Sequence, residues 1–289
     1  MSLETFTLSY GRAGRKGKTF RFSIDTAYPG QSFLKPFLAR NEVCDPPLTA
    51  AIAGFLDEGD VVFDVGANVG YYTMQALQNV GKTGAVYAFE ANPEMFRILT
   101  LNGVQNRAAN LHAFNVAVSD RPGTATFYVN PQEEGTSSLH DPRPYAPQGS
   151  LYDTIEPISV AAITLDEYFL DAGLKAVKLI KIDVEGFEPQ VLEGGRRFIQ
   201  KYRPDHIVFE VSSLMPGIPA GTDLPIRHAL ATLGYTCHLI RPMQDNDQVR
   251  AVFRDKMFLH IPESVAMQIR YGNVIATRQR IDSMTGYGP

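Results

Sequence analysis

Residues 62–70, Val-Phe-Asp-Val-Gly-Ala-Asn-Val-Gly, are the stretch on which the fold prediction for this 289-residue chain rests. An apolar run, residues 61–65, precedes a glycine turn, and an amphipathic run over residues 69–77 follows it. This order predicts a strand, a tight turn and a helix. Gly66 allows the sharp turn and the close approach of a ligand, because it has no Cβ. The free N–H groups of the helix point at whatever lies above the turn. The unit therefore predicts a nucleotide-type site at the carboxyl end of the first strand of a parallel α/β sheet.

The spacing of the glycines indicates which ligand this turn accepts. A dinucleotide fingerprint requires G-x-G-x-x-G, and the corresponding positions here hold Gly66, Asn68 and Tyr71. The second glycine brings a pyrophosphate close to the backbone, so Asn68 argues against one. Asp64 adds a negative charge that attracts a cation and repels phosphate. S-adenosylmethionine, with adenosine at one end and a cationic amino acid at the other, fits both features.

A second expected strand, residues 85–90, ends in the carboxylate of Glu90. Glu90 follows Gly66 at close to the spacing of about 20 residues at which a ribose-binding acid is found. A carboxylate here can accept hydrogen bonds from both ribose hydroxyls. The alternative is an exposed glutamate at the end of a strand.

The sequence predicts a wider set of contacts to the donor around these residues. They come from the turn, from the second strand end, and from the end of a third expected strand, residues 111–118, where an adenine ring would lie. A later strand end contributes the last of them. The set is Asp64, Gly66, Ala67, Asn68, Gly70, Glu90, Ala91, Asn92, Ala117, Val118, Ser119 and Asp183.

The composition limits the class of protein. Its 44% hydrophobic content suffices for a large core in one α/β domain with additions. The net charge of −4 gives no electrostatic reason to expect nucleic-acid binding. Cys44 and Cys237 form no metal-spaced cluster, and a disulfide between them is not expected. Since neither a signal peptide nor an apolar run of about 20 residues is found, we expect a cytoplasmic protein without a membrane span.

Three segments are expected along the chain. Residues 1–47 predict a hairpin, with a basic, glycine-rich turn, and a short helix that cover the ligand face or an edge of the sheet. Residues 48–262 predict a Rossmann-like α/β domain with a seven-stranded, mostly parallel sheet, helices on both faces and an antiparallel last strand. Within it, residues 124–163 predict a β insertion whose long loop is either a lid or disordered. Residues 263–289 are expected to form a C-terminal helix or tail.

Together these pieces resemble the class I S-adenosylmethionine-dependent methyltransferases, and more closely the FkbM family of O-methyltransferases. The resemblance covers about residues 48–262, and its most specific part is Ile-Lys-Ile-Asp-Val-Glu-Gly at residues 180–186. The other residues that carry it are 63–70, 89–93, 137–139 and 191–195. It implies transfer of a methyl group from S-adenosylmethionine to a hydroxyl of a small molecule, sugar or natural product. The resemblance indicates the type of reaction more specifically than it indicates the acceptor molecule.

Carboxylates at two later strand ends are the candidates for the chemistry. Asp183 ends an expected buried strand, Glu185 follows it, and Glu210 ends the next strand. Because converging carboxylates repel one another, one of them can have a raised pKa and act as the base. Alternatively, Asp183 and Glu210 bind Mg²⁺ or another hard cation that lowers the pKa of the acceptor hydroxyl. His140, in the expected lid, is a further candidate base. A structural role for Glu185 and Glu210, holding helix N–H groups or a lysine, also stays open.

Other functions stay open from the sequence. An N-methyltransferase for bases often carries Asn/Asp-Pro-Pro-Tyr/Phe where residues 183–186 read Asp-Val-Glu-Gly here. An NAD-dependent oxidoreductase is disfavoured by Asn68. A non-catalytic protein that binds a nucleotide-type ligand would have the same fold, since fold alone does not give function. The sequence also leaves open the metal dependence and whether the chain forms a homo-oligomer.

Overall fold

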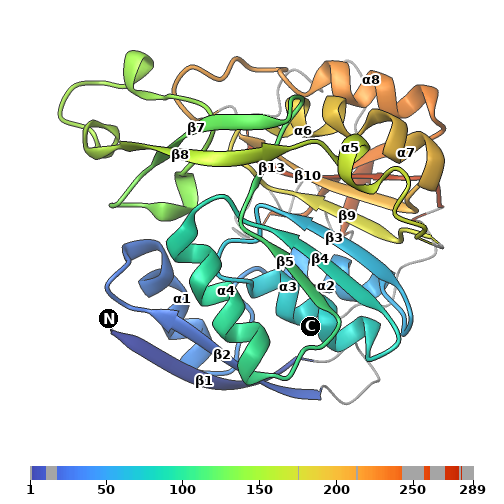
Figure 1. The fold of residues 1–289 in the computed structure, drawn as a ribbon, viewed down its shortest axis with the longest axis horizontal. Coiled ribbons are helices and arrows are strands. Elements are labelled where there is room, and N and C mark those ends of the chain that lie inside the picture. Colours follow the sequence, from blue (N-terminus) through green and yellow to red (C-terminus); the bar gives the residue numbers. More distant parts are fainter. Residues whose placement is uncertain are drawn as a thin grey trace.

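An eight-stranded sheet lies at the centre of the computed structural model, which describes residues 2–10, 18–174, 176–212, 214–242, 257–260, 271–279 and 281. The strand order within the described residues is β12-β11-β13-β10-β9-β3-β4-β5 (Figure 1). The strands are β3 (Val61–Val65), β4 (Ala85–Phe89), β5 (Leu111–Phe114), β9 (Leu179–Ile182), β10 (His206–Ser212), β11 (Thr236–Ile240), β12 (Phe258–His260) and β13 (Tyr271–Thr277).

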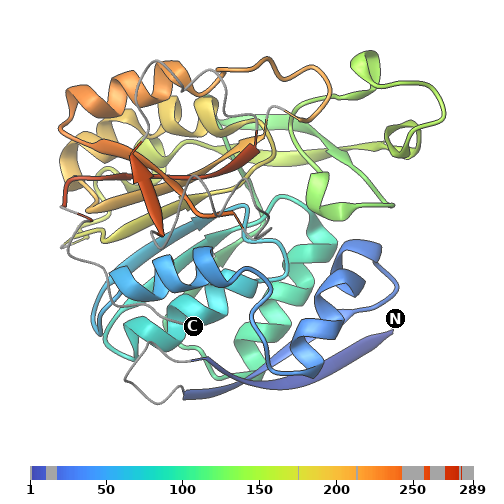
Figure 2. The same ribbon diagram turned by 180° about the vertical axis from the view of Figure 1, so that it is seen from behind.

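Helices cover both faces of this sheet (Figures 1 and 2). One layer holds α2 (Pro46–Phe55), α3 (Tyr71–Val80) and α4 (Pro93–Gln105). The other holds α5 (Leu165–Phe169), α6 (Glu188–Gly194), α7 (Arg196–Tyr202) and α8 (Leu224–Thr232). The expected Rossmann-like α/β architecture, with a mostly parallel sheet between two layers of helices, is confirmed.

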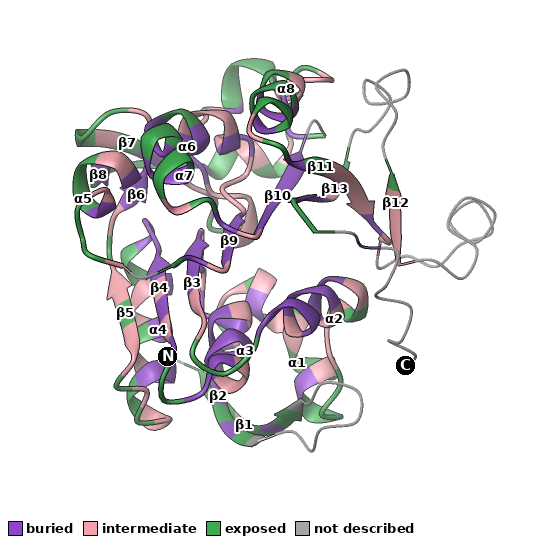
Figure 3. Cartoon of the chain, turned by 90° about the vertical axis from the view of Figure 1, so that its right-hand side faces the viewer, coloured by how far each residue is buried: buried purple, intermediate pink, exposed green. Residues whose placement is uncertain are grey.

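Alternation of side chains along the strands builds a core under each helix layer. In β3, Val62 belongs to the core beneath α2, α3 and α4, whereas Phe63 packs beneath α5 and α7. In β9, Leu179 belongs to the first core and Ile180 to the second. Because both faces are covered, these strands read as nearly continuous apolar runs. Figure 3 shows β9 and β10 buried along their length.

Strand β13 is the main difference from the expected seven-stranded sheet. It lies antiparallel between β10 and β11. Its residues 271–277 therefore do not form the helix or tail expected for 263–289. The reason lies in its sequence, Tyr-Gly-Asn-Val-Ile-Ala-Thr, in which glycine and asparagine, both rare in strands, precede three apolar residues. β11 pairs antiparallel with β12.

The expected third strand, residues 111–118, is in fact two strands. β5 ends at Phe114, and β6 (Ala117–Val118) pairs with β8 (Glu156–Ile163) in a second sheet. β7 (Gly123–Val129) pairs antiparallel with β8, which confirms the two strands expected in the insertion. The loop between β7 and β8 carries three short 3-10 helices, η1 (Glu134–Thr136), η2 (Arg143–Tyr145) and η3 (Leu151–Thr154). It projects away from the large sheet (Figure 1).

The helical segment over residues 188–202 is interrupted at Gly195, which separates α6 from α7. Two consecutive glycines favour such a break. Gly194 is also packed against the Ser119 carbonyl, since a Cβ on it would lie 2.0 Å from that oxygen. The α6 helix therefore approaches the end of β6 more closely than any other residue type would allow.

The N-terminal hairpin, β1 (Leu3–Tyr10) and β2 (Lys18–Asp25), is present as expected, and its basic turn, residues 11–17, lies outside the described residues. It packs against α3 and α4, away from the edge of the large sheet (Figure 1). The Asn102 side chain accepts from the Ser23 N–H at 2.7 Å and donates to the Ser23 carbonyl at 3.1 Å. The helix that follows the hairpin, α1 (Pro29–Ala39), contacts the insertion at η1. That the N-terminal region as a whole covers the ligand face or an edge of the sheet stays a prediction.

No helix within the described residues is both long and apolar enough to cross a membrane. Cys44 and Cys237 are free thiols. The division of the chain at residues 47 and 262 stays a prediction.

Candidate active site

The turn after β3 brings three strand ends together. Gly66, with φ of +78°, donates its N–H to the Phe89 carbonyl at 3.0 Å, and Ala67 donates to the same oxygen at 2.9 Å. A Cβ on Gly66 would lie 1.8 Å from the Asp183 carbonyl oxygen. Glycine is therefore required both by the backbone conformation and by the close approach. The ends of β3, β4 and β9 form one surface above the turn.

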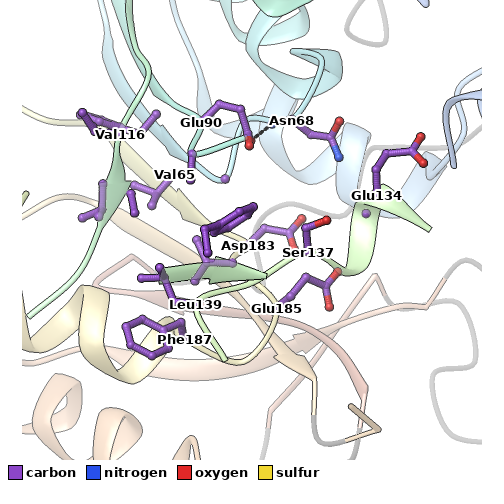
Figure 4. Close-up of a pocket in the computed structure, with 18 residues that line it drawn as sticks. Val65, Asn68, Glu90, Val116, Glu134, Ser137, Leu139, Asp183, Glu185 and Phe187 are labelled. Carbon is purple, nitrogen blue, oxygen red and sulfur yellow. Dashed lines mark hydrogen bonds between the residues drawn. The ribbon is translucent and has the colours of Figure 1, made fainter. Parts of the chain in front are cut away.

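Glu90 is fixed at the end of β4 by two backbone N–H groups. Its Oε2 accepts from Asn68 N–H at 2.7 Å (Figure 4). Its Oε1 accepts from Asn92 N–H at 2.7 Å. The residue is only 7% exposed, so it is not the exposed strand-end acid of the alternative interpretation. Burial raises the pKa of Glu90 to about 7, although both N–H bonds act to lower it. Each carboxylate oxygen keeps lone-pair capacity for a ligand hydroxyl.

Glu90 lines a pocket between the large sheet and the insertion. The lining comes from the glycine turn, the ends of β3, β4 and β9, strands β6 and β7, and the insertion loop. The lining residues are Val65, Gly66, Asn68, Phe89, Glu90, Ala91, Val116, Ala117, Val118, Phe127, Glu134, Gly135, Ser137, Leu139, Asp183, Val184, Glu185 and Phe187.

The pocket has an apolar end and an acidic end. Figure 4 shows the side chains of Val116, Leu139 and Phe187 toward one end. The carboxylates of Asp183 and Glu185 point toward the other end. Such a pocket suits a ligand with an aromatic base at one end and a positive charge at the other.

Asp183, Glu185 and Glu210 each bring a carboxylate oxygen to within 4.8 Å of the other two. Glu210 is 7% exposed, and its Oε2 has no hydrogen-bond partner among the described residues. Glu185 Oε2 accepts from the Ser212 hydroxyl at 3.2 Å. Burial, reinforced by neighbouring carboxylates, raises the pKa of Glu185 and of Glu210 well above the usual range. The three acids that the sequence singled out are therefore neighbours in space.

Lys181, which was not singled out from the sequence, balances part of this charge. Its Nζ donates to Asp183 Oδ2 at 3.0 Å and lies 3.6 Å from Asp64 Oδ1. Burial acts to lower the pKa of Lys181, but Asp183 and Asp64 outweigh it and the pKa is raised. Asp64 is buried, accepts a bond from Thr73 at 2.5 Å and does not line the pocket. Its charge is compensated inside the protein, which differs from the role expected for it.

The predicted donor contacts separate into two groups. Gly66, Asn68, Glu90, Ala91, Ala117, Val118 and Asp183 line the pocket. Besides Asp64, the remaining residues lie behind it and support the turn or the strand ends. Asn92 caps α4 by accepting from Glu94 N–H at 3.0 Å, and Gly70 packs against Leu99. Ser119 donates to Asp120, away from the pocket, and Ala67 contributes its N–H to the turn.

His140 lies outside the pocket lining. Its Nε2 is 2.8 Å from the Pro216 carbonyl, and its ring stacks on Tyr145. The structure therefore does not bring His140 to the three carboxylates.

Two contacts anchor the insertion loop beside the pocket. The Ser138 hydroxyl donates toward the carbonyl oxygens of Val184 and Glu185, at 3.1 and 2.8 Å. Glu134 accepts from the N–H groups of Gly30 and Gln31, at 3.1 and 2.7 Å, at the start of α1. The first contact holds the loop on the turn that carries the acids, and the second holds it on the N-terminal helix.

Residues 64–258 match the protein family described as the methyltransferase FkbM domain. This chain belongs to the FkbM methyltransferase family. The matched region contains both Glu90 with its two N–H donors and all three clustered acids. The resemblance noted from the sequence is thereby confirmed.

Three FkbM-related proteins show the range of the family. The 31-O-demethyl-FK506 methyltransferase FkbM of Streptomyces tacrolimicus is 33% identical over an alignment of 160 residues that covers 48% of this chain and 60% of that protein. The 2-O-methyltransferase NoeI of Sinorhizobium fredii is 28% identical over an alignment of 190 residues that covers 63% of this chain and 74% of NoeI. The hexuronic acid methyltransferase AglP of Haloferax volcanii is 31% identical over an alignment of 151 residues that covers 50% of this chain and 53% of AglP. The chain thus spans 60% of the first relative and about half of the third.

Lys181 beside this FkbM-family pocket, and Phe127 and Glu134 in its lining, are examples of residues that sequence reasoning did not identify as site residues. Lys181 could have been found, because a lysine inside an apolar strand and on the same face as Asp183 requires a buried partner. Side chains alternate between the two faces of β7, and Phe127 is on the face toward the pocket. The sequence of β7 does not show which of its two faces is covered. Glu134 lies in a loop, and no local signal links it to the start of α1.

Proposed function

We propose that this chain transfers the methyl group of S-adenosylmethionine to a hydroxyl oxygen of a small molecule or saccharide. The observation that carries the proposal is one pocket lined both by Glu90, with its two backbone donors, and by the acids Asp183 and Glu185. The printed activities of the relatives, on 31-O-demethyl-FK506, at a 2-O position and on a hexuronic acid, support it. The cytoplasmic location, the absence of a nucleic-acid partner and a homo-oligomeric state stay predictions.

The residues present fit this donor. Glu90, oriented by Asn68 and Asn92, has acceptor capacity for two ribose hydroxyls. The apolar surface of Val116 and Val118 suits an adenine ring, and the acidic end suits the positive charges of the donor. When bound, S-adenosylmethionine supplies a methyl carbon activated by its sulfonium.

The protein's part in the reaction is to hold the acceptor oxygen and take up its proton. Asp183 and Glu185 line the pocket, and the Asp183 side chain is 29% exposed, so it can be reached by an acceptor. Glu210 is buried and does not line this pocket, but its carboxylate lies close to theirs. We assign the acceptor side of the pocket to these three carboxylates, with Asp183 nearest to the acceptor hydroxyl.

Donor binding is tested by calorimetry with S-adenosylmethionine, S-adenosylhomocysteine and NAD. We expect binding of the first two and not of NAD. Glu90→Ala should weaken S-adenosylhomocysteine binding by about 1.5–3 kcal/mol, roughly 10- to 150-fold, the range for hydrogen bonds to a charged group. The matched control is Glu94→Ala, an exposed acid in the first turn of α4 that should bind like wild type. Wild-type affinity in Glu90→Ala would remove the ribose assignment.

The reaction itself is tested by following S-adenosylhomocysteine formation with 31-O-demethyl-FK506, hexuronic acids and neutral saccharides as acceptors. Asp183→Asn keeps the shape of the side chain and removes its basicity. We expect turnover to fall by ~10²–10⁴ while donor binding survives. Near-normal turnover in Asp183→Asn would exclude Asp183 from the chemistry.

A further inference from the structure

We infer that Asp183, Glu185 and Glu210 bind a hard divalent cation of the Mg²⁺ or Mn²⁺ type. The role of this site in activating an acceptor rests on the proposed function, but the site itself is defined by the three carboxylates. Each offers an oxygen within 4.8 Å of the other two, and they come from the end of β9, the following turn and β10. Oxygen is the ligand that such cations prefer.

Glu210 distinguishes this cluster from an ordinary group of surface acids. It lies on β10 between β9 and β13, more than nine-tenths buried, and its carboxylate reaches the other two. Glu210 Oε2 has no hydrogen-bond partner among the described residues. A buried carboxylate oxygen without a partner is costly, so a ligand for it is expected.

The protein groups around the cluster do not compensate its charge. Lys181 contacts Asp183, but it is shared with the buried Asp64. Ser212 donates one hydrogen bond to Glu185. On the other side lies the buried carboxyl of Glu188, whose Oε1 accepts from the Val184 and Gly186 N–H groups on either side of Glu185. One shared lysine therefore faces several acids, and a divalent cation would remove the imbalance.

The distances suit one small cation. Ligand oxygens lie 2.0–2.1 Å from Mg²⁺, so neighbouring oxygens around it are roughly 3–4 Å apart. Oxygens already within 4.8 Å need only small side-chain rotations to complete such a set. Asp183 and Glu185 also line the pocket, so the remaining coordination positions would face it. A cation there would lower the pKa of an adjacent acceptor hydroxyl.

The test uses the full-length protein, stripped of metal with a chelator and then dialysed. Mn²⁺ is added without any donor, and free Mn²⁺ is followed by electron paramagnetic resonance. We expect one saturable site per chain, and competition by Mg²⁺. Glu210→Gln and Asp183→Asn should each weaken Mn²⁺ binding at least tenfold, because each removes one charged ligand. Glu193→Gln, which removes an exposed acid on α6 outside the cluster, should bind Mn²⁺ like wild type.

Thermal unfolding of each variant is measured in parallel, so that a folding defect is separated from loss of a ligand. Equal Mn²⁺ binding by wild type, Glu210→Gln and Asp183→Asn would overturn the site. Calorimetry with S-adenosylhomocysteine separates this inference from the proposed function. If the metal-free protein binds S-adenosylhomocysteine and turns over normally in chelator, and no Mn²⁺ binds, the cation site is wrong and methyl transfer stands. If Mn²⁺ binds at one site and S-adenosylhomocysteine does not bind, the cation site stands and the proposed donor is wrong.

Discussion

At the residue scale, Gly66 is constrained in two separable ways: by its φ of +78° and by its contact with the Asp183 carbonyl. Gly149 offers a matched comparison, because its φ is +79° and a Cβ there would meet nothing within 4 Å. We expect Gly149→Ala to cost about 1–2 kcal/mol of stability from backbone strain alone, with donor affinity unchanged. Gly66→Ala adds the clash at 1.8 Å and should abolish S-adenosylhomocysteine binding. Chemical denaturation and calorimetry on both variants check this. Equal effects of the two substitutions would show that strain, not the close approach, sets the requirement.

The raised pKa of Glu90, about 7, predicts a pH-dependent donor affinity. Ribose hydroxyls donate to the carboxylate, so binding favours the deprotonated form. Affinity for S-adenosylhomocysteine should be highest above pH 7 and fall below it, by at most tenfold per pH unit, as protonation competes. In Glu90→Gln, whose side chain does not titrate, that part of the pH profile should be absent. Calorimetry between pH 5.5 and 8.5 measures the affinity of wild type and of Glu90→Gln. Superimposable pH profiles of the two proteins would contradict the assignment of Glu90 to the ribose.

The positions of single residues were predictable where a backbone rule fixed them. Gly66 was predicted from the sharp turn after the first strand, and Glu90 from its spacing to Gly66. Both residues line the pocket. Asp64 and Ser119 did not behave as expected, because sequence adjacency does not say whether a strand-end side chain faces the ligand or a neighbouring element. Asp64 meets Lys181 across the sheet, and Ser119 lies against α6.

At the scale of elements, Ser138 ties the insertion loop to the turn that carries Asp183 and Glu185. Ser138→Ala would leave two carbonyl oxygens without this donor, at a cost of about 1–3 kcal/mol where they are buried. We expect faster chymotryptic cleavage at Tyr145, which is 64% exposed on the same loop. Ser159→Ala, an exposed serine on β8, should be cleaved like wild type. Unchanged cleavage of Ser138→Ala would mean that Glu134 holds the loop by itself.

The same assay tests the lid. If residues 131–150 close over the pocket, S-adenosylhomocysteine and acceptor together should slow cleavage at Tyr145. The loop stays a predicted lid until that protection is measured.

Elements were predictable where periodicity and burial agreed. Strands β3, β4, β9 and β10 are apolar runs buried on both faces, so composition and length identified them. The break between α6 and α7 and the separation of β5 from β6 depend on contacts between distant segments, such as Gly194 against Ser119. Strand β13 was missed because residues 271–277 form a strand by pairing between β10 and β11, and their own sequence does not show this pairing.

At the scale of the whole molecule, His206 links the sheet to the α2 layer, at the end of β10 away from the pocket. Its ring stacks on Phe55, with 3.9 Å between centroids, and its Nδ1 lies 2.9 Å from the Thr277 hydroxyl of β13. Burial lowers the pKa of His206 to about 4, Lys178 and Arg278 act in the same direction, and Asp205 opposes them.

The consequence is acid sensitivity of the fold. Because the pKa of His206 is about 4 when folded and about 6.5 when unfolded, the unfolded chain binds the extra proton between these values. The contribution of His206 to the free energy of unfolding is fully present above pH 6.5. It falls by about 3 kcal/mol as the pH drops toward 4. In His206→Gln, this part of the dependence of stability on pH should be absent. Urea denaturation from pH 4 to 7 measures it, and parallel curves for the two proteins would show that another group is responsible.

Strand β13 also bears on how the chain can be shortened. The family match ends at residue 258, yet residues 271–277 pair with the whole of β10. A truncated protein cut after residue 262 would leave β10 as an open edge, with unpaired backbone groups beside Val208 and Phe209, which is a template for aggregation. During synthesis on the ribosome, β10 must likewise wait for more than fifty later residues before its second neighbour emerges from the exit tunnel. An expression fragment trimmed to the boundaries of the family match would therefore need a chaperone or a replacement strand to remain soluble.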